Sequence, residues 1–117
     1  MAKVYSLHMI ALKAGANGED FERYFREEFL AGPQLPGMKW RLLRGDRGDR
    51  AGKYLLMIEV ESTSRRSYLF PVPGPSAPEA ADELMQWVGA MGSVLARWDQ
   101  YATPFDTIFT DYVDVSG

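Results

Sequence analysis

The sequence predicts a single α+β domain, residues 1–117, in which a four-stranded antiparallel sheet carries two helices on one face in the order βαββαβ. A length of 117 residues suits one hydrophobic core. Four segments alternate in polarity as strands do, and two segments repeat apolar residues at helical spacing. The expected strands are 3–12, 38–44, 53–61 and 106–115, and the expected helices are 18–31 and a longer one ending near residue 97.

The first helix has a recognisable beginning and end. Asn17 is a residue type that caps helices, and Glu19 and Asp20 follow in the first turn, where the helix dipole favours negative charge. Gly32-Pro33 ends the helical pattern. Between strands two and three, residues 45–52 contain three glycines and two aspartates, which predicts a hairpin loop.

A proline-rich connection over residues 62–78 precedes the second helix. It allows no long regular element except a short helical turn at 64–69. Ser76 followed by Glu79 has the spacing of a capping box, which predicts the start of the longest helix.

The composition excludes several classes of function. The chain has no cysteine, which removes thiolate chemistry and cysteine metal sites and fits a reducing, cytoplasmic location. It has 13 basic and 16 acidic residues without a basic stripe, so nucleic acid is not an expected partner. No apolar run approaches the length of a membrane span, no signal peptide is visible, and no cofactor is indicated.

The predicted sheet leaves one face without helices. Strands one and three carry apolar residues on both parities, so neither face is suited to water. Because closed two-fold dimers are the commonest oligomers, the simplest cover is the same face of a second copy. The sequence therefore predicts a homodimer.

Two stretches of the chain resemble the dimeric α/β-barrel (ferredoxin-like) superfamily, most closely the EthD-like family. They are Asp20-Phe21-Glu22-Arg23-Tyr24-Phe25-Arg26-Glu27-Glu28-Phe29 and Leu35-Pro36-Gly37-Met38-Lys39-Trp40. The resemblance implies two sheets facing each other across a dimer axis, with a cavity between sheet and helices or inside the barrel. Relatives include cofactor-independent monooxygenases, isomerases and members with no demonstrated reaction. EthD-like proteins usually have a histidine near the end of helix one, where this chain has Glu28 and Phe29.

His8 is the only histidine and the candidate catalytic residue. Its unperturbed pKa lies near neutrality, so it could act as a general base on a bound aromatic or keto compound, with Ser6 on the same side of the strand. The alternative is a half-buried strand histidine that only hydrogen-bonds a neighbour, and a haem ligand is a third option. A lone histidine cannot build a multi-histidine metal site.

Further ligand-binding candidates lie on the strands and in the connection. A Glu59–Arg41 pair near His8 would form a polar cluster in an apolar chamber, or else an ordinary cross-strand ion pair. Aromatic side chains could wall a pocket for a planar molecule, and the candidates are Trp40, Tyr68 and Tyr112.

Three hypotheses remain open from the residues alone. The first is an enzyme of the dimeric α/β-barrel kind, a cofactor-independent oxygenase or isomerase acting on a hydrophobic or aromatic substrate. The second is a ligand-binding or stress-related module without chemistry. The third is a purely structural homodimer.

Overall fold

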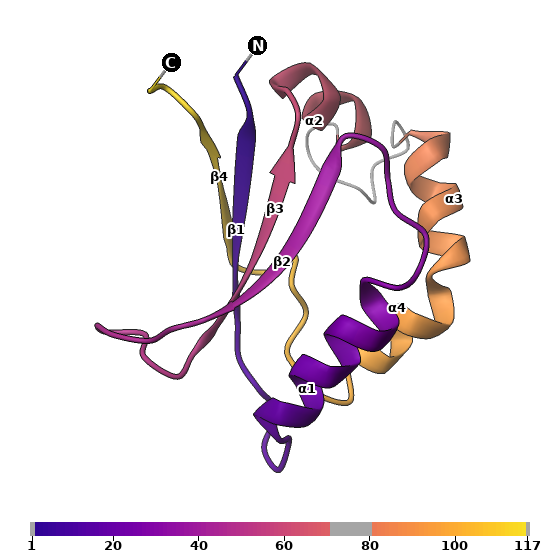
Figure 1. Ribbon diagram of the computed structural model, residues 1–117. Coiled ribbons are helices and arrows are strands. Elements are labelled where there is room, and N and C mark those ends of the chain that lie inside the picture. The colour runs from indigo at the N-terminus through magenta and orange to yellow at the C-terminus, as the bar shows by residue number, and fades with distance from the viewer. Residues whose placement is uncertain (1, 71–80, 117) are drawn as a thin grey trace.

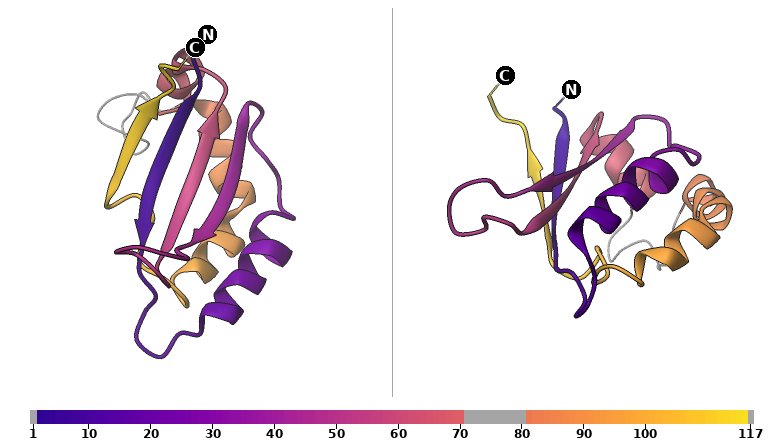
Figure 2. Two further views of the ribbon diagram at one scale, coloured as in Figure 1. Left: turned by 60° about the vertical axis from the view of Figure 1, so that its left-hand side comes forward. Right: turned by 60° about the horizontal axis from the view of Figure 1, so that its bottom comes forward.

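A computed structural model describes residues 2–70 and 81–116, which form one sheet with helices stacked on one side (Figures 1 and 2). The order of elements is β1 (Val4–Ile10), α1 (Gly18–Tyr24), η1 (Phe25–Phe29), β2 (Met38–Arg44), β3 (Tyr54–Val60), α2 (Thr63–Leu69), α3 (Asp82–Ala90), α4 (Gly92–Trp98) and β4 (Phe109–Val113). The predicted fold class is confirmed.

The sheet has the strand order β2-β3-β1-β4, with every neighbouring pair antiparallel. The first and third strands of the chain therefore lie at the centre, and the second and fourth form the edges. This order, with the helices between strands on one face, is the ferredoxin-like fold. The register aligns Ser6 with Ile58 on one side and with Asp111 on the other, and Ile58 with Trp40, so these four side chains share one face.

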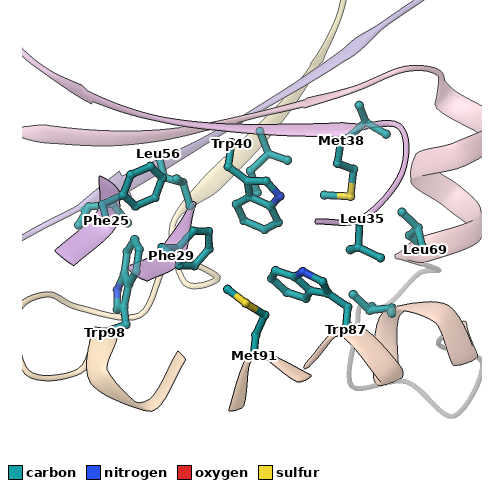
Figure 3. Close-up of a cluster of buried hydrophobic side chains, with 14 of the residues drawn as sticks. Phe25, Phe29, Leu35, Met38, Trp40, Leu56, Leu69, Trp87, Met91 and Trp98 are labelled. Carbon is teal, nitrogen blue, oxygen red and sulfur yellow. The ribbon is translucent and has the colours of Figure 1, made fainter. Parts of the chain in front are cut away.

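The core between sheet and helices is dominated by aromatic rings (Figure 3). Phe29 is fully buried, and its ring lies 5.0–6.4 Å from the ring centroids of Phe25, Trp40, Trp87 and Trp98. Trp40 stacks on Trp87 at 5.3 Å. Such pairs add to the free energy gained by burying the rings, so this cluster fixes the helices on the sheet.

The first helix begins where the sequence predicts, but its last part is not α-helical. Asn17 Oδ1 accepts hydrogen bonds from the backbone N–H groups of Glu19 and Asp20. From Phe25 the helix widens into the π-helical turn η1, closed by a hydrogen bond from Leu30 N to Phe25 O. The wider turn buries both Phe25 and Phe29, whose rings stack 5.0 Å apart.

The second long helix is divided, which corrects the prediction of a single helix. The chain leaves helical geometry at Met91, which separates α3 from α4. Met91 is fully buried, and a Cβ added to Gly32 would meet its sulfur at 2.6 Å. The close approach of Met91 to Gly32, beside the weak helix former Gly92, explains the break. The Ser76–Glu79 capping box lies outside the described residues, whereas the short helix expected at 64–69 is confirmed as α2.

The other face of the sheet has no helix over it within the described residues (Figure 2). Apolar side chains on this face are half-buried or exposed: Tyr5, Leu7, Met9, Leu43, Leu55, Met57 and Tyr112. This apolar face of the sheet is called the open face below.

No helix within residues 2–70 and 81–116 is long and apolar enough to cross a bilayer.

Candidate functional site

A buried polar cluster lies on the helix side of β1 and β4. Ser6 and His8 point to this side because they alternate with the open-face residues of β1, and both are more than nine-tenths buried. The Ser6 hydroxyl lies 2.7 Å from His8 Nε2 and donates to Asp111 Oδ1 at 2.6 Å. Arg66, on α2, donates to the second carboxylate oxygen of Asp111 at 2.8 Å. The cluster thus joins β1, β4 and α2.

The other ring nitrogen of His8 is also bonded. Nδ1 contacts the carbonyl oxygen of Phe105, which can only accept, so Nδ1 carries a proton. In the neutral ring Nε2 is therefore an acceptor, and the single Ser6 proton can go to His8 or to Asp111 but not to both. In the protonated ring all three hydrogen bonds are made at once. One proton decides which form of the cluster exists.

The burial of His8 disfavours the protonated form of its ring. Burial lowers the pKa of the imidazole below its ordinary value of 6.5, while the Phe105 carbonyl and the carboxylates of Asp111 and Asp106 act in the opposite direction. At neutral pH the ring is accordingly neutral, with an acceptor nitrogen held against the Ser6 hydroxyl. A nucleophile or proton carrier, a base and a group that orients the base are the parts that acid–base and nucleophilic catalysis require.

The cluster is covered on one side by an exposed aromatic ring. Phe109 stacks on His8 with ring centroids 5.0 Å apart, yet 51 % of Phe109 is exposed. Phe105 meets the same imidazole edge-on at 6.1 Å. Val113, on the same side of β4 as Asp111, is also exposed. A planar molecule could therefore reach His8 along β4 by displacing one ring.

The lowered pKa of His8 predicts a pH-dependent stability. Because the folded chain favours the neutral ring, this contribution is present above the unfolded-state pKa of about 6.5 and is lost as the pH falls. Denaturant unfolding at about pH 7.5 and about pH 5.5 should show a loss of stability on acidification, and the loss should be smaller in His8→Gln. The chain has one histidine, so an equal loss in both proteins would contradict the assignment.

Of the predicted site residues, Ser6 and His8 lie together, and Trp40 shares their face of the sheet. Trp40 is 5 % exposed, and its ring meets that of Phe105 at 6.1 Å, so it belongs to the core beside the cluster. Its indole Nε1 is buried with no hydrogen-bond partner among residues 2–70 and 81–116.

Four other predicted residues lie away from His8. The expected Glu59–Arg41 cluster beside His8 does not form, because both residues lie on the open face. Glu59 instead approaches Lys3, with Nζ 3.6 Å from Oε2. Tyr112 also lies on the open face, opposite Tyr5. Tyr68 is exposed on α2, where the Arg65 guanidinium lies 5.6 Å from its ring.

Sequence reasoning missed two members of the cluster, Asp111 and Arg66, and two aromatic residues that contact His8, Phe105 and Phe109. One signal was available, since Asp111 is the only acidic residue on its parity of β4, between Phe109 and Val113. Arg66 lies 45 positions from Asp111 and gives no local signal. Among the described residues, no group of three or more histidine, cysteine, aspartate or glutamate side chains could hold a metal ion.

The strand order defines the chain as a ferredoxin-like α+β protein, in which a histidine and a serine are buried beside a partly exposed aspartate. No protein-family model and no curated protein matches it, so the EthD-like resemblance stays a prediction. Among solved structures, it is similar to a dimeric protein of unknown function and ferredoxin-like fold from Bacteroides fragilis NCTC 9343. That similarity has 16% sequence identity, covers 94% of each chain and gives a TM-score of 0.49.

Proposed function

We propose that the chain is a homodimeric small-molecule-binding protein in which Ser6, His8 and Asp111 exchange a proton with a planar organic ligand bound along β4. The reaction class is an isomerase-type proton shift on a carbon acid such as an aromatic keto compound. The observation that carries this proposal is the buried imidazole, whose Nε2 faces a hydroxyl that is already shared with a carboxylate.

The proton shift needs no oxidant or reductant. The ligand loses a proton from carbon to the acceptor nitrogen of His8 through the Ser6 hydroxyl, and the electron pair of that bond becomes an enolate. The proton returns to oxygen or to another carbon, so the atoms and charge balance. Asp111 stabilises the imidazolium that exists between the two transfers, and the Arg66 guanidinium, 2.8 Å from the second oxygen of Asp111, holds this carboxylate in position.

The surroundings favour a flat and largely apolar ligand. Phe109 already stacks on the imidazole, and a planar ligand can take the place of this ring with the same geometry. The nearby Phe105 and Val113 are apolar, so the polar part of the ligand is directed to the polar cluster at Ser6 and His8.

The open face supports the homodimer part of the proposal. Its centre is apolar, while Lys39 and Glu59 lie opposite each other near its end. A two-fold axis brings identical patches together, so an acid of one copy can meet a base of the other while the apolar centres are buried. A single face with both signs of charge and an apolar centre is therefore complementary to itself.

Deuterium exchange tests the proton transfer directly. Phenylpyruvate in D₂O exchanges its benzylic protons as it enolises, and proton NMR measures the rate. The wild-type protein should accelerate exchange. His8→Gln should slow the catalysed exchange about a hundredfold, the lower end of the rate enhancement that a general base contributes.

The control for this experiment is Ser64→Ala, which changes an exposed hydroxyl on α2 away from the cluster. It should exchange at the wild-type rate. If the wild-type protein gives no acceleration, or if His8→Gln is as fast as wild type, the imidazole has only a structural role and the proposed proton transfer is wrong.

A further inference from the structure

A second site is indicated by a groove at the edge of the sheet, distinct from the His8 cluster. It has a volume of about 540 Å³ and is lined by residues of α1, η1, β2 and the start of the hairpin loop. Ligand pockets of proteins commonly have volumes of about 300–1,000 Å³. The groove is thus large enough for a small organic molecule.

The body of the groove is apolar. Phe25 and Trp40 lie at its base and are almost fully buried. Leu30 and Leu43 also line it, and they remain 38 % and 42 % exposed. Exposed leucines that converge on one concavity are a better sign of a binding surface than the same residues scattered singly.

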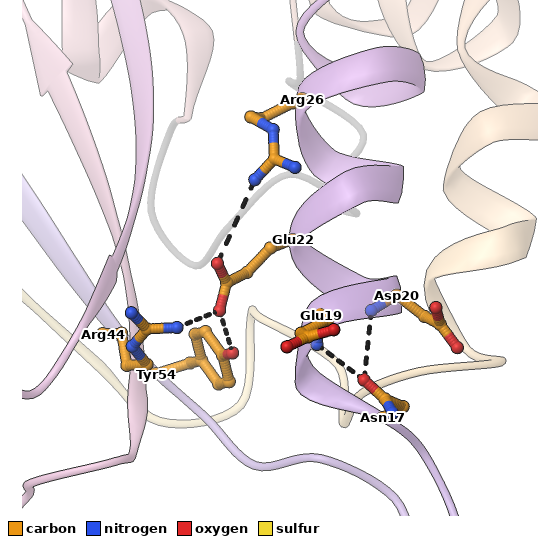
Figure 4. Close-up of polar contacts among 7 residues, drawn as sticks. All are labelled: Asn17, Glu19, Asp20, Glu22, Arg26, Arg44 and Tyr54. Carbon is orange, nitrogen blue, oxygen red and sulfur yellow. Dashed lines mark hydrogen bonds and ion pairs between the residues drawn. The ribbon is translucent and has the colours of Figure 1, made fainter.

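The polar part of the groove has more positive than negative groups. Three arginines line it, Arg26, Arg41 and Arg44, against the carboxylates of Glu22 and Asp46. Glu22 is already engaged, since it accepts hydrogen bonds from Tyr54 Oη and from Arg44 Nη1, the latter at 2.6 Å (Figure 4).

Two of the guanidinium groups are available to a ligand. Arg26 approaches Glu22 only at 4.0 Å and is largely exposed. The Arg41 side chain has no ion pair or hydrogen bond with any residue of the described ranges. A ligand carboxylate would supply the negative charge that these two arginines lack, because an arginine can bind both carboxylate oxygens in parallel.

The π-helical turn supplies a third and independent observation. The turn begins at Phe25 and is closed by the hydrogen bond from Leu30 N to Phe25 O. Both residues line the groove. Arg26 lies within this turn. Single π-helical turns are rare and are frequent at functional sites, and here the turn sets the positions of three lining residues.

We infer that this groove binds a free organic carboxylate with an apolar body, its carboxylate held by Arg26 and Arg41 and its apolar part lying against Phe25, Leu30 and Leu43. This goes beyond the proposed function, because the groove lies at the β2 edge of the sheet, opposite the β4 edge, and needs neither His8 nor Ser6. Arg41 and Leu43 belong both to the groove and to the border of the open face, since β2 is an edge strand.

Isothermal titration calorimetry with a matched pair of probes tests the site. The probes are 4-phenylbutyrate and the neutral 4-phenylbutan-1-ol, which have the same apolar body. We expect the carboxylate to bind at least about tenfold more tightly than the alcohol, the ratio that one charge-assisted contact provides. Arg41→Gln and Arg26→Gln should each weaken the binding of phenylbutyrate and leave that of the alcohol unchanged.

Arg47→Gln provides the control, since it removes the same charge from the exposed hairpin loop, outside the groove. It should bind phenylbutyrate as the wild type does, and so should His8→Gln. The inference is overturned if phenylbutyrate does not bind at millimolar concentration, if the alcohol binds equally well, or if Arg47→Gln weakens binding as much as Arg41→Gln.

Discussion

Replacing Phe29 by alanine should lower the free energy of unfolding by about 3–5 kcal/mol, the usual range for removing a buried phenylalanine. Phe29 is fully buried, and four aromatic rings surround it in the core. The substitution leaves a cavity that rigid rings cannot fill by small shifts. Urea denaturation followed by tryptophan fluorescence measures the loss.

The matched control is Met85→Ala on α3, where 52 % of the side chain is exposed. It should change the free energy of unfolding by less than about 0.5 kcal/mol, as surface substitutions usually do. If Phe29→Ala is no more destabilising than Met85→Ala, the aromatic cluster is not the packed centre of the domain.

The second large effect is expected at the open face. Met57 lies on the central strand β3, opposite Leu7 of β1 and Arg41 of β2. Met57→Arg would place a charge from each copy into the centre of the proposed interface, and a buried charge without a partner costs about 3–5 kcal/mol. The dimer dissociation constant should therefore rise by at least about a hundredfold.

Light scattering at micromolar concentration measures this change as a fall from dimeric to monomeric mass. Met85→Arg, on the helix side of the molecule, should remain dimeric. Should wild-type protein itself have a monomeric mass under these conditions, the open face is not an interface between copies.

The strands were predictable because their alternation is local. Residues 38–44 are a strand in both the prediction and the structure, and β1 and β3 are each only shorter at their ends. The division of the second helix was not predictable, because it depends on the packing of Met91 against Gly32, which lies far away in the sequence. The π-helical turn likewise follows from the burial of two phenylalanines against the sheet.

The candidate site was predictable in part. Ser6 and His8 alternate on one strand, so their shared side follows from the sequence. Which side faces the helices does not follow, because both parities of β1 are largely apolar. For the same reason Glu59 and Arg41 were expected beside His8, although the register places them on the other face.

The hairpin between β2 and β3 extends away from the body of the molecule (Figure 1), and Asp49 near its tip is exposed. The chain contains no cysteine, so Asp49→Cys would create a unique thiol for a spin label. Labels on two copies would report their mutual arrangement by pulsed electron resonance without touching the histidine cluster. The loop thus offers a built-in position for measuring how two molecules are oriented.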